Sequence, residues 1–168
     1  MAEIRITPVT GGNQEGLVAL FETFATETPV YAGLEFDEAG AREFIDDYGP
    51  DNEYNMAFIA MLGDEVAGFL FVTIYKHPCM KGTCCCDELM YTRPDLRGAG
   101  IGGVLVEEYK GWAEARDIDL VLLGSSSGIN TDFAEKFYAG HDFQPCGMLA
   151  KLGEPDVRRQ DKPQESTV

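Results

Sequence analysis

The sequence is poor in basic residues and has no long apolar run. Only 13 Lys and Arg stand against 29 Asp and Glu, so the formal net charge is −16. Direct binding to a nucleic-acid backbone is disfavoured, because that affinity comes largely from Lys and Arg. No apolar stretch approaches the roughly 18 residues of a membrane span, and the first residues do not form a secretory signal. We therefore expect a cytoplasmic protein without membrane contact, whose acidity supports solubility or attracts a cationic partner.

Cysteine pairs with zinc-ligand spacing are also lacking. The five cysteines are Cys79, Cys84, Cys85, Cys86 and Cys146, and an odd number does not suit a disulfide framework. Structural zinc sites combine two closely spaced pairs of ligands, and this chain has no second pair. We predict that the run of three supplies small buried side chains to a strand, with metal binding as the minor alternative.

Glycine, in contrast, is concentrated between Arg93 and Gly103. This segment reads Arg-Pro-Asp-Leu-Arg-Gly-Ala-Gly-Ile-Gly-Gly and precedes a helical pattern that runs through Trp112. Glycines leave backbone N–H groups unshielded, and a helix that begins there adds a partial positive charge. Such a turn suits an anion, above all a pyrophosphate. Arg97 can add a charge-assisted bond to the same phosphates.

Other phosphate-binding motifs fit this segment less well. Gly98, Gly100 and Gly103 also spell G-x-G-x-x-G, but a dinucleotide-binding loop follows a buried strand directly and meets an acidic residue about twenty positions later. Here a charged segment precedes the glycines, and the next strand runs into Gly124 and Ser125. The nucleoside triphosphate loop needs Gly-Lys-Ser or Gly-Lys-Thr, which does not occur. A plain helix-capping turn would not require four glycines beside an arginine.

The pattern of apolar residues and turns predicts a single domain over residues 1–152 and a disordered tail over 153–168. Strands are expected at 4–8, 56–62, 65–76, 84–92, 118–123 and 143–152, and helices at 14–27, 37–48, from 101 through 112, and after 130. Asn13 and Asp37 are the expected caps of the first two helices. The apolar composition of 118–123 suggests that this strand is buried. The order predicts a mixed, mostly antiparallel α/β sheet with helices on both faces.

Two stretches carry a resemblance to a known family. The segment Glu88-Leu89-Met90-Tyr91-Thr92-Arg93-Pro94-Asp95-Leu96-Arg97-Gly98-Ala99-Gly100-Ile101-Gly102 resembles the signature of the GNAT superfamily of acyl-CoA N-acyltransferases. In that family the R-x-x-G-x-G turn holds the pyrophosphate of acetyl-CoA. Ala134-Glu135-Lys136-Phe137-Tyr138, followed by Phe143, is similar to the family's last helix and the strand after it. The resemblance covers residues 4–152 and implies the family's mixed sheet.

The resemblance implies an N-acetyltransferase that moves an acetyl group from acetyl-CoA to a primary amine by direct transfer in a ternary complex. Acetyl-CoA is then the acyl-donor substrate, and no metal is needed. The implied donor contacts are Met90, Tyr91, Thr92, Arg97, Gly98, Ala99, Gly100, Ile101, Gly102 and Asn130. The alternative is a non-catalytic module of the same fold that binds acyl-CoA and uses its acidic surface for partner contacts.

Two residues are candidates for proton transfer in this reaction. Glu88 lies on the strand that leads to the site, where the family often has a carboxylate, and is the expected general base; Asp87 points to the opposite face. His77 in the preceding turn is a second candidate. Tyr138 aligns with the tyrosine that, in the family, often protonates the departing CoA thiolate.

The acceptor is expected to be an amine on a small molecule or a protein. In the family, the connection between the first two helices borders the acceptor site, so Tyr31, Glu35 and Phe36 are candidate contacts. The chain departs from the family pattern where Thr131 replaces a common asparagine and Asp142 a common glycine. The segment 143–152 is also too short for the usual closing hairpin, so a second subunit of a homodimer is an alternative source of that wall.

Overall fold

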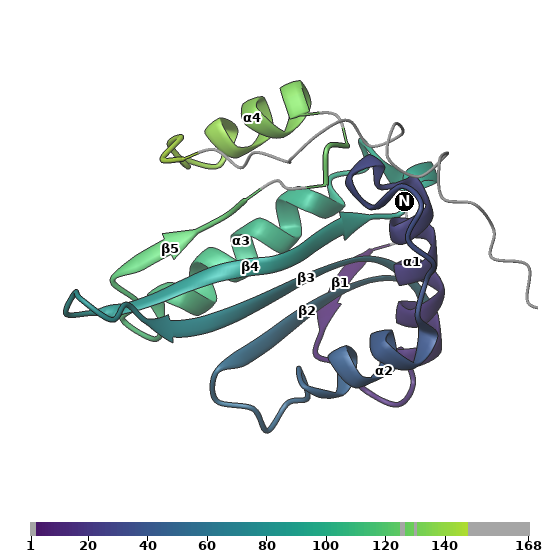
Figure 1. Cartoon of the computed structure of the whole chain (residues 1–168), viewed down its shortest axis with the longest axis horizontal. Helices are drawn as coiled ribbons and strands as arrows, with labels where there is room; N and C mark the ends of the chain where they lie inside the picture. Colours follow the sequence, from purple (N-terminus) through teal and green to yellow (C-terminus); the bar gives the residue numbers. More distant parts are fainter. Residues whose placement is uncertain (1–2, 125–126, 130, 148–168) are drawn as a thin grey trace, which may run out of the picture.

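The computed structural model describes residues 3–124, 127–129 and 131–147 (Figure 1). The strands are β1 (Ile4–Thr7), β2 (Asn55–Leu62), β3 (Glu65–Lys76), β4 (Thr83–Thr92) and β5 (Leu120–Leu122). The α-helices are α1 (Gln14–Glu27), α2 (Glu38–Asp46), α3 (Ile101–Glu114) and α4 (Thr131–Gly140), and two short 3-10 helices are η1 (Pro29–Tyr31) and η2 (Pro94–Leu96). Within these ranges, no helix has the length and apolar character needed to cross a membrane.

The strands form one sheet in the order β1-β2-β3-β4-β5. The first three pairings are antiparallel, and β4 pairs with β5 in parallel, because α3 carries the chain back to the starting end of β4. α1 and α2 lie on one face of the sheet and α3 on the other (Figure 1). The predicted mixed, mostly antiparallel sheet with helices on both faces is confirmed.

Strand β3 is buried on both faces and separates two apolar cores. Phe69 and Phe71 point toward α1 and α2, where Phe21 stacks on Phe69 with ring centroids 4.7 Å apart. Leu70 and Val72 point toward α3, because successive side chains of a strand alternate between its faces. The central strand on which the site depends is therefore held from both sides.

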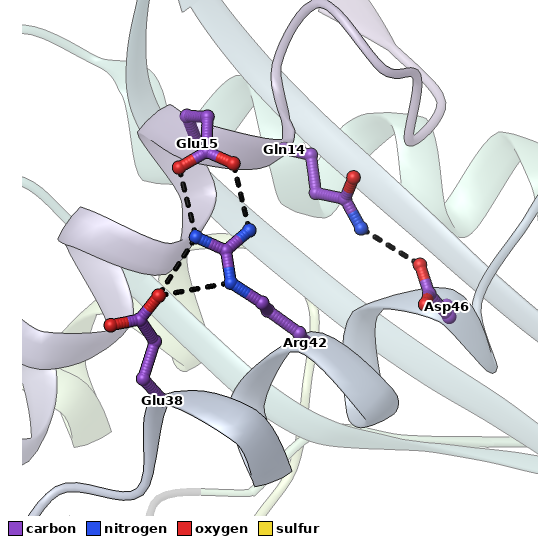
Figure 2. A network of polar contacts seen from close by, with 5 residues as sticks. All are labelled: Gln14, Glu15, Glu38, Arg42 and Asp46. Carbon is purple, nitrogen blue, oxygen red and sulfur yellow. Dashed lines mark hydrogen bonds and ion pairs between the residues drawn. The ribbon is translucent and has the colours of Figure 1, made fainter.

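Helices α1 and α2 are joined on their outer surface by an arginine and two glutamates (Figure 2). Arg42 on α2 donates from Nη1 and Nη2 to the two carboxylate oxygens of Glu15 on α1, at 2.7 and 2.9 Å. It also donates to Glu38, one turn earlier on α2, at 2.9 and 3.0 Å. Beside this cluster, Gln14 donates to Asp46 at 2.8 Å. These contacts hold α2 against the first turn of α1.

The three consecutive cysteines lie in β4, and two of them are buried as predicted. Cys84 and Cys85 are buried, Cys86 is half-buried, and all five cysteines are free thiols. Cys85 faces α3, where the hydroxyl of the fully buried Tyr109 lies 3.0 Å from its sulfur. In the part of the chain that the structure describes, no three His, Cys, Asp or Glu side chains are placed to hold a metal ion.

Expectations for the C-terminal part need correction. β5 is shorter than the predicted strand 118–123, and its Leu120 is 47% exposed rather than buried, because β5 is the last strand of the described sheet. Residues 143–147 were expected to begin a strand and do not lie in one. The remainder of that expected strand and the tail over 153–168 lie outside the described residues.

The caps of the first two helices differ from each other. Asp37 caps α2 as predicted, accepting a hydrogen bond from the Gly40 N–H at 3.0 Å. Asn13 stands at the N-cap position of α1, as predicted, but its side chain makes no hydrogen bond to the helix. Its amide instead holds the preceding turn, accepting from the Thr10 N–H at 2.9 Å and donating to the Pro8 carbonyl at 2.9 Å.

Candidate functional site

The turn between β4 and α3 covers residues 93–100, and we call it the phosphate turn after its predicted ligand. It contains two glycines in the left-handed conformation. Gly98 has φ +86° and Gly100 has φ +85°, values that residues with a side chain rarely adopt. Gly100 immediately precedes α3, and no side chain in the described part of the chain caps this helix. The first N–H groups of a helix have no intrahelical acceptor, so the start of α3 presents backbone donors together with its partial positive charge. The residues at Gly98 and Gly100 must be glycine for backbone reasons.

Gly102 and Gly103 serve a different purpose, the close packing of α4 against α3. A Cβ atom on Gly102 would lie 3.3 Å from the ring of Phe137, and one on Gly103 would lie 3.4 Å from the ring of His141. Both contacts are tighter than ordinary van der Waals separation. The small residues of the motif thus let α4 lie directly beside the phosphate turn.

Arg97, the predicted phosphate ligand, is paired with Glu27 at the end of α1. Its two terminal nitrogens each donate to a carboxylate oxygen at 2.5 Å, and its guanidinium lies 5.3 Å from the ring centroid of Tyr91. The Tyr91 hydroxyl donates to the same carboxylate. Hydrogen bonds from Arg97 lower the pKa of Glu27, and the carboxylate raises the pKa of Arg97. The arginine therefore already holds an anion in the bidentate geometry that a phosphate also accepts.

The Glu27 side chain also borders a hollow on the surface of α1. This hollow has a volume of about 400 Å³ and is lined by Glu22, Thr23, Thr26, Glu27 and Pro94. Its two carboxylates make it a poor site for a phosphate and a favourable one for a cation. The phosphate turn and an anionic surface thus lie next to each other, with Glu27 contacting both.

Strands β4 and β5 part after three residue pairs. The parallel pairing joins Cys84–Cys86 to Leu120–Leu122, and in the described residues it does not continue further along β4. Met90, Tyr91 and Thr92 remain paired with β3 on their other side. Backbone groups of this part of β4 that point away from β3 have no strand partner among the described residues. We call this place the gap, and the resemblance leads us to expect the thioester there.

Glu88 occupies a β-bulge in β4. Asp87 pairs with Val72 and Leu89 pairs with Phe71, so Glu88 is an extra residue in its strand. It is exposed, and its charge adds to burial in raising the pKa of Tyr48, which follows α2. A bulge re-aims a side chain, and simple alternation along the strand gives no sign of it.

Tyr138 and Asp87 both contact Gly124, just beyond the end of β5. The Tyr138 hydroxyl lies 2.6 Å from the Gly124 carbonyl oxygen, to which it donates, and Asp87 Oδ1 accepts from the Gly124 N–H at 2.6 Å. Burial raises the pKa of Asp87 to about 6. The structure thus connects Tyr138 with Asp87 through Gly124. Sequence reasoning missed the Asp87 contact, because it depends on the register between two strands far apart in the chain.

Three further residues named from the sequence have different outcomes. Asn130 lies outside the described residues. His77 is in the β3–β4 turn, at the opposite end of β4 from the phosphate turn (Figure 1), and accepts a bond from the Cys79 N–H at 3.2 Å. It does not belong to this site. Asp142 has φ +70°, which explains why the family often has glycine at this position.

The connection between α1 and α2 reaches the loop that follows β5. The Val30 nitrogen lies 3.5 Å from the Ser127 carbonyl oxygen. Tyr31 and Phe36 are half-buried and pack against the core beneath α1, so they are first of all structural residues. Glu35 is exposed. Among the three candidate acceptor contacts, Glu35 is the one whose side chain is accessible to a substrate.

Comparison with known proteins places this geometry in a family context. The sequence profile of the acetyltransferase (GNAT) family matches residues 17–143, which is well over half of the chain and includes both the phosphate turn and Tyr138. No curated protein sequence matches the chain.

Solved structures with a similar fold extend over nearly the whole chain. A transcriptional regulator from Bacillus halodurans C-125 superposes with a TM-score of 0.74 at 21% identity, over 90% of this chain and 99% of its own. The aminoglycoside N-acetyltransferase AAC(6')-Iy in complex with CoA gives 0.71 at 13% identity, over 91% and 95%. A ribosomal-protein-alanine N-acetyltransferase from Brucella melitensis biovar Abortus 2308 gives 0.66 at 17% identity, over 89% and 96%. At such identities, the likeness establishes the fold.

Proposed function

Because the chain belongs to the acetyltransferase (GNAT) family, we propose that it is an N-acetyltransferase that transfers the acetyl group of acetyl-CoA to a primary amine, by direct transfer in a ternary complex. The observation that carries this proposal is the turn at the start of α3, where two left-handed glycines stand beside Arg97. A helix start with open N–H groups suits a pyrophosphate. The structure of AAC(6')-Iy with CoA supports the same donor here.

In this proposal the phosphates of the donor are bound by the Arg97 side chain and by backbone N–H groups of Gly98, Gly100, Ile101 and Gly102. Ala99 contacts the donor without its N–H, which donates to the Leu96 carbonyl at 3.1 Å. Asn130 is a further proposed contact. Binding exchanges one anion for another, because Glu27 occupies both terminal nitrogens of Arg97. A pyrophosphate carries more charge than a carboxylate and also bonds to the turn, so it displaces Glu27.

The acyl group then lies in the gap where β4 and β5 part. The open edge of β4 at Met90, Tyr91 and Thr92 offers a backbone N–H to the thioester carbonyl, a preorganised dipole of the kind that stabilises a developing oxyanion. An acceptor amine with a pKa near 10.4 must lose a proton first, which costs about 4 to 5 kcal/mol at pH 7. Glu88 takes this proton, directly or through a water. Its exposed position on the bulge keeps it accessible to an acceptor.

The transfer proceeds in two steps, of which the first makes a bond and the second breaks one. The amine nitrogen attacks the thioester carbonyl carbon, a C–N bond forms, and the carbonyl oxygen takes up the negative charge. When this intermediate collapses, the C–S bond breaks, its electron pair leaves with the sulfur, and the nitrogen gives its extra proton to water, so that a neutral amide remains. Tyr138 gives its hydroxyl proton to that thiolate and regains one from solvent. The hydroxyl is held at the Gly124 carbonyl, and Asp87 accepts from the N–H of the same residue.

We propose an amine on a small molecule or on a protein as the acceptor. The net charge of −16 attracts cations, and the hollow beside the phosphate turn adds two carboxylates locally. Both acceptor classes occur among the names of the structural neighbours, which include an aminoglycoside and a ribosomal-protein acetyltransferase. An amine library that covers aminoglycosides, polyamines and lysine-containing peptides therefore addresses the question.

The test is calorimetric titration of acetyl-CoA into the wild type and two matched double variants. Arg97→Ala with Gly100→Val removes the guanidinium and forces a side chain into a left-handed position. The control, Arg42→Ala with Gly111→Val, makes the same two chemical changes away from the turn. Gly111 is not in the left-handed conformation, and a Cβ on it meets nothing within 4 Å. Micromolar binding to the wild type and the control, lost in the first variant, is the expected result. Absence of binding to the wild type would refute the proposal.

Turnover of the amine library, measured as thiol release, then separates an enzyme from a non-catalytic acyl-CoA-binding module. An enzyme requires Tyr138, and Tyr138→Phe should lower kcat by roughly a hundredfold while it leaves the affinity for acetyl-CoA unchanged. A module without catalysis would bind the donor equally well in both proteins and release no thiol in either.

A further inference from the structure

The parallel pairing of β4 with β5 is bracketed at its two ends by aspartate side chains. Before the first residue pair, Asp119 Oδ2 accepts from the Thr83 N–H at 2.7 Å. After the third pair, Asp87 Oδ1 accepts from the Gly124 N–H at 2.6 Å. Each carboxylate takes the place of a strand partner by bonding a backbone N–H of the opposite segment. The first end also has a backbone bond, from the Asp119 N–H to the Thr83 carbonyl at 3.0 Å.

The two ends differ in what the bonded residue contacts next. Gly124 also accepts the Tyr138 hydroxyl at its carbonyl oxygen, so a single residue connects β4 to α4 across the open gap. Thr83 belongs to the β3–β4 hairpin, at the far end of the sheet from α4 (Figure 1). Only the Asp87 end of the pairing therefore leads to the residue to which we assign proton transfer.

We propose that Asp87 is a positioning residue for Tyr138: by holding the Gly124 N–H, it fixes the carbonyl that in turn orients the Tyr138 hydroxyl at the mouth of the gap. This inference rests on the proposed function, because it concerns the acid of that reaction. Asp87 needs no contact with either substrate to act in this way. It works through one residue, Gly124, whose N–H and carbonyl belong to the two peptide groups on either side of its Cα.

The surroundings of Asp87 agree with a role as hydrogen-bond acceptor. The groups that face it are Cys86 and Glu88 on β4, Tyr109 on α3, Gly124 after β5 and, through Gly124, Tyr138 on α4. Among the described residues, no Lys, Arg or His forms an ion pair with it. Burial raises its pKa to about 6, yet it is ionised at neutral pH, and a charged acceptor makes a stronger bond to an N–H than a neutral one.

Three variants test the proposal with steady-state kinetics. Asp87→Ala removes the acceptor, Asp87→Asn keeps a carbonyl oxygen in its place without the charge, and Asp119→Ala removes the equivalent bracket at the other end. We expect Asp87→Ala to lower kcat by roughly tenfold to a hundredfold, as a displaced reacting group does, with an unchanged KM for acetyl-CoA. Asp87→Asn should restore most of kcat, and Asp119→Ala should keep the wild-type value. Equal losses in Asp87→Asn and Asp87→Ala would overturn a positioning role in favour of direct proton transfer.

A second measurement keeps the test independent of turnover. With ¹³Cζ-labelled tyrosine and ¹⁵N-labelled protein, the resonances of Tyr138 and of the Gly124 amide report on the two bonds without any substrate. Both should shift in Asp87→Ala, shift less in Asp87→Asn, and stay in place in Asp119→Ala. If the wild type shows no turnover with any amine, the proposed function fails, and these shifts still decide whether Asp87 sets the Tyr138 hydroxyl. Unchanged resonances, or shifted resonances with an unchanged kcat, would overturn the inference.

Discussion

Two arginines in this protein each hold a glutamate with both terminal nitrogens, in regions with different roles. Arg42 joins α2 to α1 through Glu15 on the outer surface (Figure 2). Arg97 joins the phosphate turn to the end of α1 through Glu27. In both pairs the arginine lowers the pKa of the carboxylate, and its own pKa is raised. As ion pairs, the two are nearly the same.

The difference between them lies in what surrounds each guanidinium. Arg42 has a second carboxylate partner, Glu38, so its single positive charge is more than neutralised by the two glutamates that it joins. Arg97 has one carboxylate partner, an aromatic ring beneath it, and the two left-handed glycines that open α3 close to it in sequence. The comparison teaches that ion-pair geometry alone does not identify a binding residue. The neighbouring backbone does.

The largest expected effect is on donor binding by the single variants Arg97→Ala and Arg42→Ala. Loss of charge-assisted hydrogen bonds costs about 1.5 to 3 kcal/mol, so Arg97→Ala should raise the Kd for acetyl-CoA by roughly tenfold to a hundredfold. The Glu27 carboxylate, left without its partner, adds repulsion. Arg42→Ala should stay within about twofold of the wild type. Calorimetry measures both, and equal losses would show that the two arginines do not differ in function.

A smaller effect of opposite sign is expected from Glu27→Gln. If Glu27 competes with phosphate for Arg97, its neutralisation removes the competitor, and a gain of about fivefold in acetyl-CoA affinity corresponds to an exposed ion pair worth about 1 kcal/mol. The glutamine still accepts the Tyr91 hydroxyl bond. Glu15→Gln is the matched control and should leave the affinity unchanged. Weaker binding by Glu27→Gln would mean that Glu27 orients Arg97 rather than competing for it.

The sequence allowed most of the elements and the glycine turn before α3 to be predicted, because both are encoded by local spacing. Apolar residues at helical spacing predicted α1 at 14–27, and the Gly63-Asp64 turn predicted the β2–β3 hairpin. The R-x-x-G-x-G pattern predicted a turn into α3, and the left-handed Gly98 and Gly100 provide its physical reason. These features depend on residues within a few positions of each other.

Contacts set by tertiary register could not be predicted in the same way. The partner of Arg97 stands 70 positions away in sequence, and nothing near Glu27 signals the pairing. The bulge at Glu88 and the Asp87 contact with Gly124 depend on how β4 aligns with its two neighbours. The exposure of Leu120 depends on its place at the sheet edge, which an apolar run does not reveal.

Arg97→Ala is expected to have the larger effect on acetyl-CoA affinity, but Arg42→Ala should have the larger effect on thermal stability. Arg42→Ala removes a contact between two helices and leaves Glu15 and Glu38 facing each other without a cation. Arg97→Ala leaves Glu27 with the hydrogen bond from the Tyr91 hydroxyl. We therefore expect Arg42→Ala to lower the melting temperature by a small but measurable amount, and Arg97→Ala to lower it less. Differential scanning calorimetry without ligand measures both melting temperatures. A larger decrease for Arg97→Ala would contradict the structural role that we assign to Arg42.

The smallest effect is one in which the two clusters should behave alike. The pKa values of Glu15 and Glu27 are lowered from 4.5 in the folded protein, in each case first by the hydrogen bond from its arginine. A lowered folded pKa contributes stability that is present above the unfolded value of 4.5 and is lost as the pH falls through the folded pKa. Urea unfolding at a series of pH values should therefore show a shallower acid loss in Glu15→Gln and in Glu27→Gln alike. Similar slopes, together with stronger acetyl-CoA binding in Glu27→Gln alone, would show that the two pairs differ through their surroundings and not through their own electrostatics. A change in only one slope would trace the difference to the ion pair itself.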